Sequence, residues 1–437
     1  MIGGRIGTTS RIALIAAAGL LSSGVAAQAA DLGGNCCADL EERVAELEAT
    51  TARKGNRVVS LTVSGHVNEA LLYWDDGINS GARIATNGYS MTRFRFRGDA
   101  KINADWSAGF YIELGLGRTG MSYDVNQWEG NRYGGYGVAP GIRHQALYIK
   151  SKSLGTVWMG HTTDVVDGII DICLGCPITS SPESGLGWNG MYMAGGVGGS
   201  QYGNMTLGDL RIGNEGHYGT RRNLVKYITP TFGGFSFSAS WGDDDSSAAD
   251  FGFDTGTHGY IWDVALRYAG EFGAFRVAAG AGYTEYTDRD NVSSWAGSAS
   301  IQHVPTGLYV QGAFAHKNLG EVPVGLNDED QMWSVQVGIA QKWNSLGKTT
   351  FWVQYQEYEN GFTEGTGPGA GDLLAVSNVL GTDATIISGG INQKIDAAAM
   401  ELYVSYYNVQ GDVNLDGIGV TDLNTYHFVL AGARIQF

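Results

Sequence analysis

The architecture of this chain is clearest in residues 91–102, which read MTRFRFRGDAKI. Every second position, beginning with Arg93, is polar and mostly cationic, whereas the positions between them, beginning with Phe94, are apolar or small. A β-strand sends successive side chains to opposite faces, so this segment predicts a strand with one polar and one apolar face. After a turn at 103–104 the next segment alternates in the same way, with Tyr111 and Glu113 on its polar side.

The same alternation continues to the last residue, and it predicts sixteen strands. Short turns and long loops alternate between them, and most segments have the roughly 9–11 residues that a transmembrane strand needs. A soluble sandwich has no reason to keep all its long loops at one end. We therefore predict an all-β fold, a 16-stranded antiparallel transmembrane β-barrel. The predicted strands are 58–74, 91–102, 105–116, 141–150, 155–162, 221–230, 233–242, 260–270, 273–286, 292–303, 306–316, 330–344, 347–358, 385–395, 397–408 and 425–437.

Composition excludes several other classes. The 437 residues include 67 glycines and only 7 prolines, and 16% are charged, whereas average usage is about 7% glycine and about 25% charged residues. Glycine weakens helix interiors, and an aromatic content of 11% argues against disorder. The net charge of −16 argues against a nucleic-acid partner, because such proteins carry clustered basic surface. No GxSxG or HExxH motif is present, so we predict no enzymatic activity.

The N-terminus predicts export. An apolar stretch ends at Ala27-Gln28-Ala29, which fits a signal-peptidase site, so residues 1–29 are predicted to be a signal peptide. The apolar stretch is shorter than the ~20 residues of a membrane-spanning helix, and no later segment is long enough to be one. The bacterial outer membrane is the predicted location of a chain that is exported and built from strands.

A short helical segment is predicted between the signal peptide and the barrel, in residues 30–57 on the periplasmic side. Leu40, Val44 and Leu47 recur on one helical face. This face either docks on its own chain or associates in an oligomer. Residues 58–437 make up the predicted barrel domain.

Three segments resemble the general porins of the alphaproteobacteria. They are residues 39–68 (DLEERVAELEATTARKGNRVVSLTVSGHVN), 92–110 (TRFRFRGDAKINADWSAGF) and 223–244 (NLVKYITPTFGGFSFSASWGDD). The C-terminal Phe437 also matches the family, in which it is an assembly signal. The resemblance implies a homotrimer that passes small hydrophilic solutes, with the loop after the fifth strand folded into the pore. It also implies contacts with outer-membrane lipid, lipopolysaccharide and the barrel-assembly machinery.

The narrowest part of a pore and its charged groups set selectivity, and the sequence offers two candidate walls. The cationic wall would consist of Arg93, Arg95 and Arg97, joined by Arg143, which shares an alternate face with Gln145. By the resemblance, Arg93 and Arg143 match positions where porins carry pore arginines. The alternative is an ion-paired strand face that has no filtering role.

The acidic wall would come from the long loop 163–220, because loops of this length are usually functional. Asp164, Asp167 and Asp171 are favoured because they lie closest to the barrel wall, and Glu183 is a fourth candidate. Their spacing of three and four suits one face of a short helix. Opposite the arginines, these carboxylates would create a transverse field. The alternative is that they only solvate an outer loop.

The same loop contains Cys173 and Cys176, which are separated by two residues. In an oxidising compartment this spacing predicts a stabilising disulfide. Zinc binding is the alternative, although no second pair of ligands stands at metal spacing.

A calcium pattern is present near the C-terminus, where residues 412–417 read DVNLDG. Asp412, Asn414 and Asp416 occupy the ligand positions at the start of a calcium loop. The twelfth position is Leu423 instead of glutamate, so a polar loop without calcium is the alternative. No other cofactor is predicted.

Passive diffusion of small hydrophilic solutes and ions through a water-filled channel is the favoured function. The alternative is a substrate-specific channel, for sugars or anions, on the same barrel. A sugar track would use aromatic residues of the long loops, the candidates being Trp128, Trp188, Tyr192 and Tyr202. A third possibility is a non-conducting adhesin or structural barrel, which reconstitution without conductance would reveal.

Overall fold

The computed structural model describes residues 58–116, 126–127, 141–177, 191–195, 206–208, 210, 221–243, 259–287, 292–319, 328–359 and 379–437. The predicted signal peptide and the predicted helical segment lie outside these residues. So do Glu183 and three of the proposed sugar-track aromatics, Trp128, Trp188 and Tyr202.

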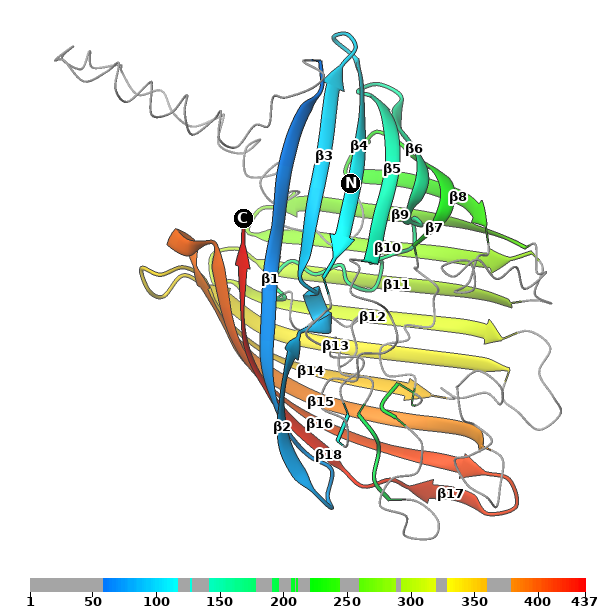
Figure 1. Ribbon diagram of the computed structural model, residues 1–437, viewed down its shortest axis with the longest axis vertical. Helices are drawn as coiled ribbons and strands as arrows, with labels where there is room; N and C mark the ends of the chain where they lie inside the picture. Colours follow the sequence, from blue (N-terminus) through cyan, green and yellow to red (C-terminus); the bar gives the residue numbers. More distant parts are fainter. Residues whose placement is uncertain are drawn as a thin grey trace.

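The described residues form one antiparallel sheet, in which the first strand pairs with the last and closes a barrel (Figure 1). The sheet has eighteen strands. They make sixteen staves, by which we mean sixteen strand positions around the barrel wall. Two positions hold two strands each, because β2 and β3 lie end to end along β1, and β17 and β18 lie end to end along β16. The predicted sixteen-stranded barrel is therefore confirmed. The strands are β1 (Ser60–Asp75), β2 (Ser80–Thr86), β3 (Arg93–Lys101), β4 (Trp106–Gly115), β5 (Gly141–Ser151), β6 (Gly155–Thr163), β7 (Arg221–Ile228), β8 (Phe235–Asp243), β9 (Tyr260–Phe272), β10 (Phe275–Tyr286), β11 (Val292–His303), β12 (Leu308–Leu319), β13 (Glu329–Gln341), β14 (Thr349–Glu359), β15 (Val379–Ile395), β16 (Met400–Leu415), β17 (Gly419–Asp422) and β18 (Tyr426–Gln436).

Two of these strands lie where loops were predicted. β2 occupies part of the expected loop 75–90, and β17 pairs with the end of β16 inside the expected loop 409–424. Both are hairpin extensions with no continuous apolar face. The alternation that marks a membrane-facing strand is therefore missing from them, and the sequence pattern could not reveal them.

The two faces of the barrel wall are chemically opposite. On β13 and β14 the buried, inward positions include Ser334, Gln336 and Gln354, whereas Val337 and Val353 are exposed on the outside. Amides inside and bare aliphatic side chains outside are the arrangement that lipid requires. No helix in the described part of the chain is long or apolar enough to span a membrane.

One stave is interrupted by a turn that folds toward the interior, residues 87–92, which we call the inward turn. It contains the 3₁₀ turn η1 (Gly88–Ser90). The Tyr89 ring stacks on Tyr407 of β16 at 6.4 Å, and Asn87 Nδ2 donates to Tyr403 OH at 2.9 Å. Because β1 and β18 lie between β3 and β16 in the sheet, these contacts cross the inner face of the barrel seam.

The C-terminal residue is part of the same seam. The Gly65 amide of β1 donates to the Phe437 carbonyl at 2.9 Å, and the Phe437 ring lies 5.4 Å from the Phe94 ring of β3. Any side chain at Gly65 would collide with the Phe437 ring. The terminal aromatic residue therefore packs across the first two staves of the barrel.

Candidate pore constriction

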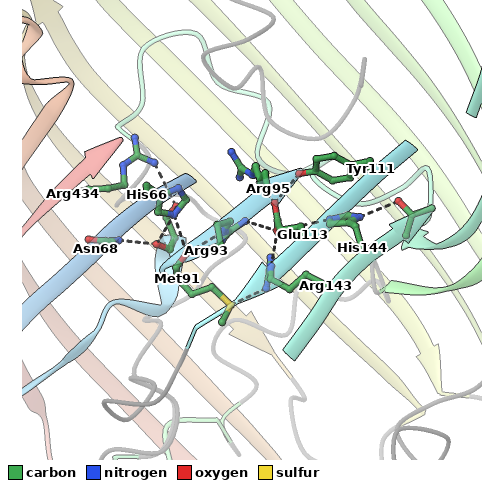
Figure 2. Close-up of polar contacts among 12 residues, drawn as sticks. His66, Asn68, Met91, Arg93, Arg95, Tyr111, Glu113, Arg143, His144 and Arg434 are labelled. Carbon is green, nitrogen blue, oxygen red and sulfur yellow. Dashed lines mark hydrogen bonds and ion pairs between the residues drawn. The ribbon is translucent and has the colours of Figure 1, made fainter. Parts of the chain in front are cut away.

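The arginines predicted from the sequence gather around a carboxylate that the prediction did not include. Arg93 NH1, Arg95 Nε and Arg143 Nε lie 3.2, 2.6 and 2.7 Å from the Glu113 carboxylate (Figure 2). The phenolic OH of Tyr111 also donates to Glu113 at 2.7 Å. We call these residues, Arg93, Arg95, Arg143 and Glu113, the arginine cluster.

Strand register brings the cluster together. The tight turn between β3 and β4 pairs Arg95 directly with Glu113 and Arg93 with Gly115. Because residue 115 is a glycine, the space beside Glu113 is open, and the Arg143 side chain occupies part of that space. A turn at 103–104 already implies this pairing, so Glu113 could have been found from the hairpin alone.

Arg143 faces inward as predicted, but the predicted reason, an inward face shared with Gln145, is wrong. Gln145, which was expected on the same face, is exposed on the outside of β5. The β4–β5 register shifts at Glu113, where Glu113 pairs with His144 and Leu114 with Ile142, so Arg143 is the extra residue of a β-bulge. A bulge re-aims a side chain locally, and this one turns Arg143 inward together with His144.

The cluster carries an excess of positive charge. Three guanidinium groups and one carboxylate give a formal charge of 3 − 1 = +2. The Glu113 side chain is only 2% exposed, whereas Arg95 is 34% exposed. A solute on the inner side of this wall therefore meets cationic groups, and the compensating anion lies beneath them.

The inward turn supports the cluster from the other side. Arg93 Nε donates to the Met91 carbonyl at 2.9 Å, and Arg143 NH1 lies 2.9 Å from Met91 Sδ. His66 Nε2 contacts the same carbonyl at 2.8 Å. Met91 thus contacts two of the three arginines, Arg93 through its carbonyl and Arg143 through its sulfur, as the close-up shows (Figure 2).

Arg97 shares the inward face but belongs to a separate group. It pairs with Asp99 at 3.0 Å, and its guanidinium lies 5.4 Å from the centre of the Tyr148 ring. Both members of the Arg97–Asp99 pair are more than two-fifths exposed, so this pair is weaker and more strongly hydrated than the arginine cluster.

The first described part of the long loop, residues 164–177, lies against the inner side of β9 to β12. Its carbonyl and amide groups bond Arg267 of β9, Ser298 and Ser300 of β11 and Gln311 of β12. The prediction of a short helix here is wrong. The segment consists of turns, which are closed by hydrogen bonds from the Ile169 amide to the Val166 carbonyl and from the Ile172 amide to the Ile169 carbonyl. The aliphatic side chains here pack on the wall, which disfavours a solvated helix.

The predicted loop acids are positioned unequally. Asp164 is buried and lies 3.8 Å from Arg222 of β7. Burial, together with the neighbouring Asp263, raises the pKa of the Asp164 carboxyl well above its usual range, although Arg222 opposes this. Asp171 is buried too, and Asp167 is half-buried. The carboxylate that pairs with Arg93, Arg95 and Arg143 is Glu113 of the barrel wall, which the sequence prediction did not include. A filtering role for the loop acids stays a prediction.

The two loop cysteines are bonded. Cys173 and Cys176 form a disulfide with a Cα–Cα distance of 5.6 Å. The turn between them lies flat on Tyr309 of β12, where a side chain at Gly175 would collide with the ring. The disulfide therefore closes a turn that is already pressed onto the wall.

The residues of the calcium pattern do not fit a calcium loop. Asp412 and Asn414 lie in β16, opposite Asp422 and Val420 of β17, and Asp416 lies in the turn between the two strands. The three residues therefore follow the path of a hairpin, whereas the ligands of a calcium loop wrap around one ion. In the described ranges no group of three His, Cys, Asp or Glu residues could hold a metal. Calcium binding stays a prediction.

Comparison with known proteins settles the family. The family model for Gram-negative porins matches residues 13–414. The chain belongs to the Gram-negative porin family. This porin is accordingly an outer-membrane channel of a Gram-negative bacterium, and it is not an enzyme. No curated protein sequence matches it significantly.

Solved structures share the fold of this porin. The anion-selective porin from Comamonas acidovorans is 16% identical, with 87% of this chain and 100% of that chain covered and a TM-score of 0.51. Salmonella typhi OmpF, in complex with daunomycin, is 15% identical, with 88% and 99% covered and a TM-score of 0.51. The trimer form of Vibrio cholerae OmpT is 14% identical, with 87% and 100% covered and a TM-score of 0.51.

Proposed function

We propose that this porin lets small hydrophilic solutes and ions diffuse passively across the outer membrane, and that the arginine cluster is its charge filter. The observation that carries the proposal is the convergence of three arginines, from β3 and β5, on the single carboxylate of Glu113 on β4 between them. Their formal excess of positive charge faces the interior through Arg95, the most exposed member.

The size of the effect follows from Coulomb's law. A monovalent anion about 6 Å from one unit charge in water gains about 0.7 kcal/mol before screening. A fixed charge of +2 therefore stabilises an anion at that distance by about 1.4 kcal/mol, which raises its local concentration roughly tenfold. Salt screens this attraction over a Debye length of about 10 Å at 0.1 M, so the preference declines as ionic strength rises.

We propose that the loop acids contribute less to this filter than the arginines do. Asp164 and Asp171 are buried against the wall. Asp167 is the most solvent-exposed of the three described acids, so it is the one that we expect to act on passing ions. If the double variant Asp167→Asn, Asp171→Asn leaves ion preference unchanged in planar bilayers, the loop acids have no filtering role.

An anion-preferring, substrate-specific channel is the second candidate, and the charge excess of the arginine cluster favours it over a sugar channel. A solved structure with this fold bears the description of an anion-selective porin. Of the proposed sugar-track aromatics, the structure describes Tyr192, whose backbone amide binds Gln127 Oε1 at 2.8 Å.

Liposome swelling with neutral and anionic solutes of graded size separates the candidates. A smooth decline of rate with size supports general diffusion, whereas saturation by one anion supports a specific channel. The absence of any swelling or conductance after reconstitution would reject both and favour a structural barrel. The reversal potential in a KCl gradient then reports whether anions or cations are preferred.

We also propose a homotrimer in contact with outer-membrane lipid and lipopolysaccharide, inserted by the barrel-assembly machinery. The apolar outer face and the trimer form of a protein with this fold support this assembly. Heat-dependent mobility in a denaturing gel tests it, because an unheated trimer migrates differently from the heated monomer.

A further inference from the structure

A fork of hydrogen bonds from β9 holds the beginning of the long loop. Arg267 NH1 donates to the Val165 carbonyl at 2.9 Å, and its NH2 donates to the Asp167 carbonyl at 2.8 Å. Four residues earlier on the same strand, Asp263 Oδ1 accepts a hydrogen bond from the Val165 amide at 2.8 Å. Both donor and acceptor groups of Val165 are thus held by one barrel strand, immediately after the loop leaves β6.

Further along, the loop backbone is held by neutral side chains of the next strands. Ser298 Oγ donates to the Ile169 carbonyl, and Gln311 Nε2 donates to the Ile170 carbonyl at 3.0 Å. The Leu174 amide donates to Ser300 Oγ at 3.1 Å. These bonds are directed at main-chain atoms, so they fix the path of the loop whatever its side chains are.

The loop's apolar side chains enter a socket made by two glycines of β10. Val166, Ile169 and Ile172 are buried there. A methyl group at Gly280 would collide with Ile172 Cδ1, and one at Gly282 would lie 3.0 Å from Val166 Cγ1. Because β10 has no side chains at these two inward positions, the wall leaves room there for the apolar side chains of the loop.

We propose that Arg267 is a positioning residue for the pore, and that it and the Gly280–Gly282 socket hold residues 164–177 against the wall and thereby set the open cross-section. The inference rests on the proposed channel function. Charge alone does not explain the arrangement. Arg222, Lys226 and the acids Asp164, Asp167 and Asp263 surround the same region, yet Arg267 directs its fork at two carbonyl oxygens. A guanidinium suits this task because its donors have a fixed planar geometry that an ammonium lacks.

The first test compares Arg267→Lys with Arg267→Gln in the full-length trimeric protein. Lysine keeps the charge but cannot hold both carbonyls in the same geometry. We expect both variants to raise amide exchange in residues 164–177 by about tenfold, the value for losing one bond to a charged group. Single-channel records should show more frequent partial closures as well. Ser334→Ala is the control, because Ser334 Oγ is buried on β13 with no hydrogen-bond partner in the described part of the chain.

The second test is a rescue. Gly280→Ala should force Ile172 out of the socket and raise both the amide exchange of residues 164–177 and the noise of the single-channel current. The double variant Gly280→Ala, Ile172→Ala should return both quantities to their wild-type values. Heat-dependent gel mobility checks that each barrel has folded. If Gly280→Ala does not fold, Arg267→Lys still decides the matter.

Three results would overturn the proposal: Arg267→Lys behaving as wild type while Arg267→Gln does not, unchanged exchange in both variants, or a socket variant that its partner substitution does not rescue. A wild-type protein that does not conduct would instead refute the channel function, while the exchange measurement still reports on the fork and the socket.

Discussion

Replacing Glu113 by glutamine tests the charge filter most directly. The substitution preserves the size of the side chain and removes the one negative charge among Arg93, Arg95 and Arg143, so the formal charge of the cluster changes from +2 to +3. Each unit charge acts on an anion about 6 Å away with about 0.7 kcal/mol in water. Because the added charge attracts an anion and repels a cation by that amount, we expect the preference for anions over cations to rise about tenfold at low salt, less at high salt.

Stability should change in the opposite direction. Glu113 accepts bonds from three guanidinium groups and from Tyr111, and breaking a buried ion pair on one side costs about 3–5 kcal/mol. The variant barrel should therefore unfold in less denaturant than the wild type does. A more selective but less stable channel is the combined expectation.

The assay is the zero-current potential of the reconstituted channel across a tenfold KCl gradient. Arg95→Gln should lower the anion preference by a similar factor, because it changes the cluster from +2 to +1. The double variant Glu113→Gln, Arg95→Gln restores +2 and should return the potential to its wild-type value. A Glu113→Gln channel with unchanged selectivity, or a double variant that does not return to it, would refute the reasoning.

Three further predictions concern other parts of the molecule. Reducing the Cys173–Cys176 disulfide should accelerate amide exchange within its turn, because closing so short a loop contributes about 2 kcal/mol; unchanged exchange under dithiothreitol would contradict this. A hydrogen bond from Ser151 holds the pKa of Asp105, in the β3–β4 turn, below its usual range. Its stabilisation is present above pH ~4 and should be lost as the pH falls through the lower folded-state pKa, which exchange in the turn, with Asp105→Asn as the pH-insensitive comparison, will show. Phe437→Ala removes an aromatic pair worth about 1 kcal/mol and should slow barrel folding in detergent more than Ile435→Ala in the adjoining β18 does.

The sixteen staves could be predicted from sequence because lipid imposes a period of two over long segments. All sixteen segments expected from that period contain a strand. β2 and β17 escaped because they have no continuous apolar face. Periodicity reports contact with lipid, and it does not report hydrogen bonding between strands as such.

The constriction was predictable only in part. Arg93 and Arg95 follow from alternation on β3, and Glu113 follows from the register that the β3–β4 turn imposes. The inward orientation of Arg143 depends on a bulge, and an inserted residue has no signature in a single sequence. The helix expected at 164–171 failed because it was inferred from the spacing of three aspartates alone, whereas the aliphatic residues between them pack on the wall in successive turns.

The inward turn makes the seam of the barrel different from its other strand pairs. Asn68 of β1 bonds Ser90 of the turn at 2.9 Å, and Tyr403 OH of β16 donates to Asn68 at 2.8 Å. Tyr403 and Asn68 stand 335 residues apart in the chain, so they meet only when the last strands arrive. Until then, the backbone N–H and C=O groups along the facing edges of β1 and β18 also lack partners, which is costly in lipid. An unclosed barrel is therefore a high-energy species, and completion of the seam is the step that commits the chain to its native form.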